Sequence, residues 1–214
     1  MFFLQKNSHE KPLHYFMLGV LFWFPLCFFI WYIAAQYHLA PIVWLSDLVL
    51  QQYLADAVMW LRLDHHTLIL ASNFGENELG HIVSPPIGDD LLGFHLNPLI
   101  YAYSLPLLYA LILATPQANK WYRLLVGTLL LLPTELFSML SSLLKTLSFD
   151  VGLAFQQQQQ LSGLELEFIA LAYQIGTLIV PMVAPLVIWV ALHRDFLLQL
   201  APQLMLHLNK PSQI

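Results

Sequence analysis

The sequence predicts an all-α integral membrane protein with four transmembrane helices and a small extracytoplasmic α+β insertion between the first two. Of its 214 residues, 58% are hydrophobic and only 10% are charged, whereas soluble domains carry roughly 25% charged residues. Four apolar stretches approach or exceed the length of about 20 residues that crosses the hydrocarbon core of a bilayer. They lie at residues 15–35, 98–115, 124–144 and 168–192.

Composition also limits the chemistry that the chain can carry. Cys27 is the only cysteine, so neither an intramolecular disulfide nor a cysteine-based zinc site can form. The net charge of −5 argues against nucleic acid as a partner. The sequence contains no phosphate-binding loop, no GxSxG and no HExxH motif. We therefore expect no catalytic residues, no metal and no cofactor.

The first predicted span, residues 15–35, is rich in aromatic residues and has Pro25 in its interior. No small-residue cleavage site follows it, so it should remain as a span. Residues 36–96 then form the insertion. Apolar residues recur at a period of 3.6 over residues 46–61, which predicts an amphipathic helix on the membrane surface or on the other spans. A short second span is the alternative, but three charges between residues 47 and 62 oppose it.

Two short strands are predicted later in the insertion. Residues 67–74 and 79–83 are apolar runs around Gly75-Glu76-Asn77-Glu78, which is typical of a β-hairpin. The Ser84-Pro85-Pro86 sequence should end regular structure before the second span begins.

The entrance to the second span is well marked. Asn97 is a good helix cap, and Pro98 suits the first helical turn because its missing N–H removes no bond there. Tyr101 and Tyr103 follow in the first two turns. At 100° per residue they should point about 200° apart, so they should face different neighbours.

Asp89, Asp90 and His95 cluster just before this span, and three further histidines lie in the same loop, at residues 65, 66 and 81. Carboxylates and imidazoles together can bind a metal or perform acid–base chemistry. The histidines lack the spacing of an HxxxH motif, however, and two aspartates ahead of an apolar helix are an ordinary arrangement at a helix N-terminus. We therefore predict that these residues do not bind a metal.

Glu135 is the one ionisable residue well inside a predicted span. A carboxylate at that depth costs several kcal/mol unless it is paired, protonated or hydrated, so a role in transport or catalysis is one hypothesis. The alternative is a structural glutamate that forms a hydrogen bond with Tyr173 or Gln174 of the last span and holds the helices together. We favour the structural role.

The positive charges predict the orientation. Six of the eight basic residues lie on the side of the two termini, at positions 6, 11, 120, 123, 194 and 210, whereas Arg62 and Lys145 lie on the other side. Because cytoplasmic segments carry the excess of lysine and arginine, both termini should be cytoplasmic. The insertion is then extracytoplasmic.

Two stretches resemble the exosortase H-associated membrane proteins, small bacterial inner-membrane proteins encoded beside an exosortase. They are the helix entrance, residues 97–107 (NPLIYAYSLPL), and the aromatic-proline segment of the first span, residues 22–27 (FWFPLC). The resemblance implies an inner-membrane location. Exosortases are polytopic proteases that are thought to use Cys, Arg and His near the outer membrane face. No cysteine lies in such a place here, so the similarity is to the accessory protein, whose family offers no known catalytic residues.

This resemblance implies a non-catalytic accessory or assembly factor for a membrane-bound protein-sorting protease. The expected partners are the lipid bilayer and a membrane protein, either an exosortase-like protease or its substrate. The expected contact surface lies around the helix entrance: Asp89, Asp90, His95, Asn97, Tyr101 and Tyr103. The alternative is a small membrane transporter or enzyme centred on Glu135.

Overall fold

The first helix, α1, extends from Lys11 to Tyr53 in the computed structural model, which describes residues 11–86 and 91–200. The prediction of a span at 15–35 and a separate helix from residue 46 was wrong in this respect, because the two are one continuous helix. Its buried residues continue through the join at intervals of three or four, the spacing of one helix face: Cys27, Trp31, Ala35, Leu39, Ile42, Ser46 and Leu50.

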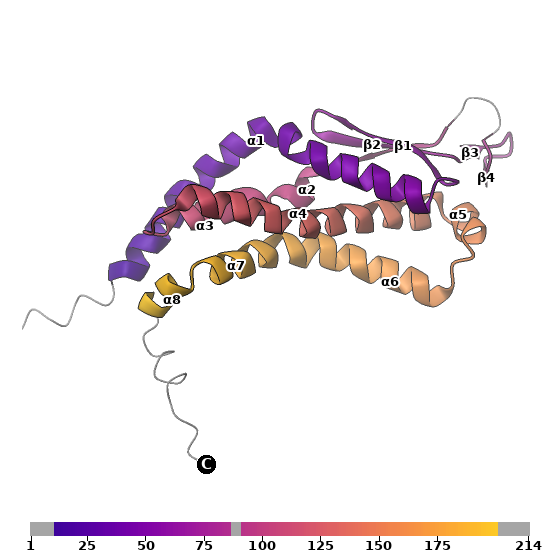
Figure 1. Cartoon of the computed structure of the whole chain (residues 1–214). Helices are drawn as coiled ribbons and strands as arrows, with labels where there is room; N and C mark the ends of the chain where they lie inside the picture. The colour runs from indigo at the N-terminus through magenta and orange to yellow at the C-terminus, as the bar shows by residue number, and fades with distance from the viewer. Residues whose placement is uncertain (1–10, 87–90, 201–214) are drawn as a thin grey trace, which may run out of the picture.

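At 1.5 Å per residue, the 43 residues of α1 measure about 65 Å, well beyond the roughly 30 Å of the hydrocarbon core. Pro25 and Pro41 lie inside this helix, and Figure 1 shows that α1 changes direction along its length. A proline removes one backbone hydrogen bond and is a common cause of such a bend. The part of α1 after the bend carries the β-sheet.

The sheet consists of β1 (Val58–Asp64), β2 (Thr67–Ser72) and β5 (Gly93–Leu96), antiparallel and in the order β1-β2-β5. The strand predicted from residue 67 is confirmed. Its partners are β1 and β5, so the predicted pairing with residues 79–83 was wrong, as was the extension of the amphipathic helix to residue 61. Two-residue strands β3 (Gly75–Glu76) and β4 (Ile82–Val83) form a separate ribbon.

Side chains of α1 bond to the outer edge of β1, which would otherwise present unpaired backbone groups. The backbone N–H of Leu61 donates to Asp47 Oδ1 at 3.0 Å, and Gln51 Nε2 donates to the carbonyl of Met59 at 2.9 Å. The apolar face of the sheet includes Leu61 and Leu70, which are both buried. The insertion is therefore fixed to α1 through its edge, and its apolar face is part of the hydrophobic core.

The predicted second span is interrupted. It forms α2 (Leu99–Ala102) and α3 (Ser104–Ala114), with a break at Tyr103. The predicted cap at Asn97 was wrong by one residue, because Pro98 is the N-cap and Leu99 is the first helical residue. Asn97 Oδ1 still accepts a hydrogen bond from the N–H of Leu99 at 3.1 Å. The apolar segment Leu99–Ala114 measures about 24 Å if fully helical, which is shorter than a typical span.

The remaining chain forms two long helical passes. Helix α4 (Lys120–Lys145) continues into the π-helix η1 (Thr146–Val151), and the short α5 (Leu153–Gln158) leads to the return pass. That pass consists of α6 (Gly163–Gln174), the π-helix η2 (Ile175–Ile179) and α7 (Val180–Leu192), followed by α8 (Arg194–Leu200).

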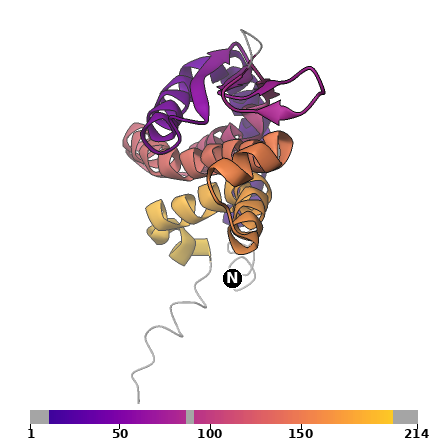
Figure 2. The same cartoon turned by 90° about the vertical axis from the view of Figure 1, so that its right-hand side faces the viewer.

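Three helical stretches are long and apolar enough to cross a membrane, at Leu13–Tyr53, Lys120–Val151 and Gly163–Leu192. They include three of the four predicted spans. Figures 1 and 2 show three layers: α1 with the sheet, then α2 to α4, then α6 to α8. The start of α1, the α3–α4 connection and α8 lie at one end of the molecule, and the sheet and α5 lie at the other (Figure 1).

The end at which α1 starts and α8 lies is packed around an aromatic cluster. Phe16 stacks on Trp189 with ring centroids 5.2 Å apart, and Phe196 contacts both rings. His193 is buried beside Trp189, and this burial lowers the pKa of its imidazole below the ordinary value, so the ring is neutral at pH 7. This cluster holds α1, α7 and α8 together.

Candidate functional site

Glu135 lies on α4, about 22 Å along the helix from Lys120, and only 1% of it is exposed. Both of its carboxylate oxygens have partners from other helices. His38 Nε2 of α1 lies 2.8 Å from Oε2, and the hydroxyl of Ser104 on α3 donates to Oε1. We call these three residues the Glu135 cluster.

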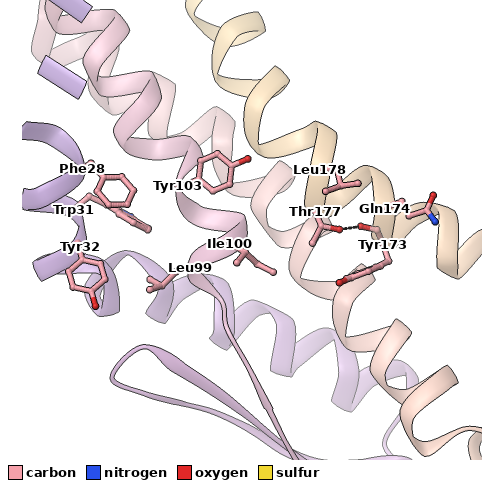
Figure 3. Close-up of a pocket in the computed structure, with 10 residues that line it drawn as sticks. All are labelled: Phe28, Trp31, Tyr32, Leu99, Ile100, Tyr103, Tyr173, Gln174, Thr177 and Leu178. Carbon is pink, nitrogen blue, oxygen red and sulfur yellow. Dashed lines mark hydrogen bonds between the residues drawn. The ribbon is translucent and has the colours of Figure 1, made fainter. Parts of the chain in front are cut away.

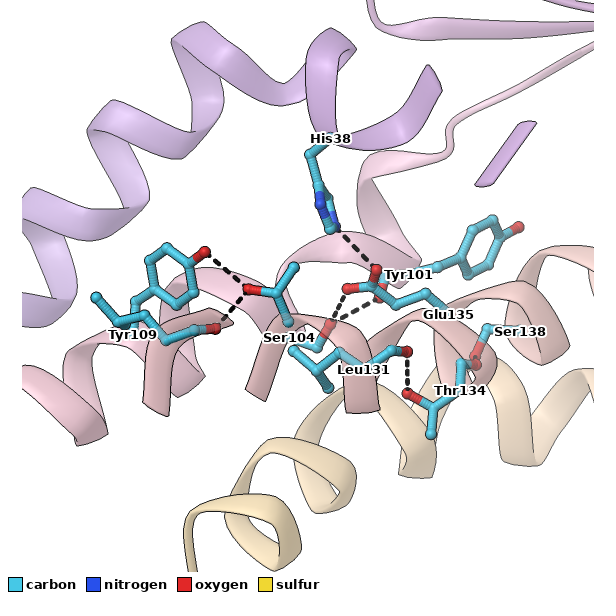
Figure 4. Close-up of polar contacts among 10 residues, drawn as sticks. His38, Tyr101, Ser104, Tyr109, Leu131, Thr134, Glu135 and Ser138 are labelled. Atoms are coloured by element: carbon cyan, nitrogen blue, oxygen red, sulfur yellow. Dashed lines mark hydrogen bonds and ion pairs between the residues drawn. The ribbon is translucent and has the colours of Figure 1, made fainter. Parts of the chain in front are cut away.

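The cluster joins two layers of the bundle (Figure 4). His38 belongs to the layer of α1, whereas Ser104 and Glu135 belong to the middle layer, and the His38 side chain is only 11% exposed. An ionised carboxylate can only accept hydrogen bonds, so Nε2 of His38 carries the proton if Glu135 is charged. Both carboxylate oxygens thus have a hydrogen-bond partner within the protein, as buried polar atoms require.

These partners differ from the expected ones. Glu135 bonds to His38 and Ser104, and the expected hydrogen bond to Tyr173 or Gln174 is absent from the described part of the chain. Tyr173 and Gln174 instead line a groove beside Tyr103 (Figure 3). We did not foresee the role of His38, although its position beside Ala35 and Leu39 of the buried stripe could have indicated it.

The two tyrosines of the helix entrance face different neighbours, as their spacing requires. Tyr101 is 2% exposed, and its hydroxyl donates to Ser142 on α4. Tyr103 is half-buried and lines the groove in Figure 3. Tyr101 therefore holds α2 against α4 and is closed to a partner, whereas part of Tyr103 is accessible.

The rest of the expected contact surface is partly described. His95 is exposed on β5, opposite Ile69 of β2, and Asn97 is exposed at the start of α2. Asp89 and Asp90 lie outside the described residues. His95, Asn97 and Tyr103 therefore form the accessible part of the helix entrance, which we call the entrance surface.

The order in which the three side chains of the Glu135 cluster contact one another limits the chemistry that they can perform. In a Ser-His-acid triad the imidazole lies between the hydroxyl and the carboxylate and accepts the hydroxyl proton. Here the carboxylate lies between Ser104 and His38, so the imidazole is not placed to activate the serine. Among the described residues no group of three or more His, Cys, Asp or Glu side chains could hold a metal ion. The arrangement suits helix cross-linking or the uptake of a proton.

Comparison with known families agrees with this architecture. A family model described as exosortase H-associated membrane protein matches residues 10–196, which include every helix and strand up to the start of α8. Searches of curated proteins and of solved structures gave no significant match. Since the match extends over most of the sequence, the chain belongs to the family of exosortase H-associated membrane proteins.

Proposed function

We propose that this protein is a non-catalytic accessory or assembly factor of the bacterial inner membrane that serves a protein-sorting protease of the exosortase type. The observation that carries the proposal is the family match over residues 10–196, because the family is described by its association with exosortase H. We infer from that association that the partner is a membrane protein, either the protease or its substrate.

The geometry of the Glu135 cluster supports a non-catalytic role. Both oxygens of the carboxylate are occupied by side chains of the same protein, and a catalytic group must be able to reach a substrate. Interhelical hydrogen bonds of this kind contribute about 0.6 kcal/mol on average in membrane proteins, up to about 1.7. Glu135 thus serves to join helices α1, α3 and α4.

The entrance surface is the proposed contact for the partner. His95 and Asn97 are exposed and Tyr103 is half-buried, and they lie where the insertion joins the apolar helices α2 and α3. A partner that contacts both the membrane and the extracytoplasmic space would meet this junction.

A genetic experiment tests the proposal. Deleting the gene should reduce cleavage of a sorting-signal reporter by the exosortase of the same cell, and the wild-type protein should restore it. Glu135→Gln should restore it as well, because the amide keeps the shape and can still bond to both His38 and Ser104. Unchanged cleavage in the deletion strain would contradict the accessory role.

A small transporter or enzyme centred on Glu135 is the second candidate. It is favoured by the buried pair of Glu135 and His38, two groups that can exchange a proton at 2.8 Å. In that case Glu135→Gln would abolish the function, since an amide cannot take up a proton, while the amount of protein in the membrane stayed normal. That result would replace the structural role of Glu135 with a chemical one.

A further inference from the structure

The three-stranded sheet has two edges, and only one of them is covered by α1. The strand order β1-β2-β5 makes β1 and β5 the edge strands. On β1, side chains of α1 bond to the outward backbone groups: Asp47 accepts from the N–H of Leu61, and Gln51 donates to the carbonyl of Met59. An edge strand without such cover presents a row of free N–H and carbonyl groups that can pair with another chain. We therefore consider the outer edge of β5.

The hydrogen bonds of the sheet show which residues of β5 face this edge. The backbone N–H of Ser72, at the end of β2, donates to the carbonyl of Leu92 at 3.0 Å, so Leu92 faces β2. Because the backbone groups of successive residues point to opposite sides of a strand, Phe94 also faces β2, whereas Gly93 and His95 face outward. Gly93 and His95 are both exposed, and their outward backbone groups form no hydrogen bond within the described part of the chain.

The chemistry of this edge matches an extended polypeptide. Gly93 and His95 each offer one N–H donor and one carbonyl acceptor, and a further strand supplies the complementary groups at the same spacing. The edge also lies where the insertion meets the apolar helices, because only Asn97 and Pro98 separate β5 from α2. A segment that pairs with β5 is thus close to the point at which its own chain enters the membrane.

A second copy of this chain does not suit the edge as an antiparallel partner. The strands β1 and β2 run along the direction of α4 and α6 (Figure 1), and β5 is antiparallel to β2. Antiparallel pairing of two β5 strands would therefore turn one copy end over end relative to the other, which two copies with the same orientation in a membrane cannot do. The family is described by its association with exosortase H, which favours that membrane protein as the partner.

We propose that an extended segment of the exosortase, next to one of its membrane spans, adds to β5 as a further strand and bonds to the outward backbone groups of Gly93 and His95. This inference rests on the proposed function, because it takes the partner from it. It specifies how that partner is held at the entrance surface: backbone hydrogen bonds give the affinity, and side chains such as that of His95 modulate it.

Amide hydrogen exchange on the wild-type protein tests the pairing without any substitution. The full chain in detergent is measured alone and with the purified exosortase of the same cell, with fragmentation that resolves single amides. The amides of Gly93 and His95 should exchange fast in the free protein and slow by about tenfold or more in the complex, because a bonded amide exchanges only when it opens. The amide of Phe94 is the internal control, since it faces β2 and should already be slow in the free protein.

A pair of variants at Gly93 gives an independent test. Gly93 is the first residue of an edge strand and its N–H faces outward, a position at which proline is tolerated. Gly93→Pro removes this N–H and should raise the Kd for the exosortase about fivefold, the factor that corresponds to about 1 kcal/mol for one hydrogen bond. Gly93→Ala is the matched control, because a methyl group there meets nothing within 4 Å and the N–H remains.

The outcomes separate this inference from the function on which it rests. If the exosortase does not bind the wild-type protein, the proposed function fails and the strand pairing fails with it. If it binds but the amides of Gly93 and His95 stay fast, or if Gly93→Pro binds as tightly as Gly93→Ala, only the strand pairing is overturned. Slow exchange of these amides in the chain alone, or on addition of a sorting-signal peptide but not of the exosortase, would also overturn it, because another chain would then occupy the edge.

Discussion

At the scale of single residues, the buried carboxylate of Glu135 is stabilised by hydrogen bonds to two side chains that are distant in sequence. His38 is 97 positions away and Ser104 is 31 positions away. A charged or polar group inside a membrane protein is stable only if such partners exist. The Glu135 cluster therefore depends on the correct packing of α1 against α3 and α4, and it forms only after these helices have come together.

Tyr101 gives a sharper test of packing at this scale. Tyr101→Phe removes the hydroxyl that donates to Ser142 in a buried position, so we expect a loss of about 1 kcal/mol in stability. Tyr103→Phe is the matched control, because Tyr103 is only half-buried and its hydroxyl makes no hydrogen bond within the described residues. Thermal unfolding in detergent, followed by near-ultraviolet circular dichroism, measures both variants.

Equal stability of the two variants would contradict the structural role of Tyr101.

The sequence could identify Glu135 because a single charge in an apolar run is conspicuous. It could not identify His38 as the partner, because the predicted first span ends at residue 35 and His38 lies beyond it. The expected partners, Tyr173 and Gln174, were chosen because they are polar residues of a span. Which polar residues meet depends on the rotation of each helix, and local pattern does not fix the rotation of neighbouring helices.

At the scale of the elements, the contact between α4 and η2 depends on Gly176. A methyl group at this position would lie 3.0 Å from the backbone Cα of Ser138 and 3.2 Å from Ser141 Oγ. Because a backbone atom cannot move aside cheaply, we expect Gly176→Ala to destabilise the protein by about 1–3 kcal/mol. Gly163→Ala is the control, because a methyl group there would meet nothing within 4 Å.

The same unfolding measurement compares these two variants. If Gly176→Ala were as stable as Gly163→Ala, the helices would not be in the close contact described. Two wild-type-like melting curves would therefore refute this packing.

The elements with a strong local signal were predicted, and those that depend on tertiary contacts were not. The apolar runs at 124–144 and 168–192 lie in α4 and in the return pass. By contrast, residues 58–61 have helical periodicity but belong to β1, because pairing with β2 and contact with α1 outweigh the local pattern. The break at Tyr103 was likewise not predicted, although Pro106 lies nearby.

At the scale of the whole molecule, the arrangement of the helices agrees with the orientation predicted from the uneven distribution of basic residues. The start of α1, the α3–α4 connection and α8 share one end of the molecule (Figure 1). Reporter fusions at Lys120 and Asn209 should therefore give a cytoplasmic signal, and a fusion at Asn77 should give a periplasmic one. A periplasmic signal at Asn209 would contradict the orientation that we propose.

Co-purification with the exosortase of the same cell tests the accessory function most directly. The tagged protein is extracted in mild detergent as wild type, as His95→Glu, and as His81→Glu, which places the same charge on an exposed histidine elsewhere in the insertion. We expect the exosortase to elute with wild type and with His81→Glu, and to be reduced with His95→Glu at equal amounts of tagged protein. Absence of the exosortase from the wild-type eluate would contradict the proposed function.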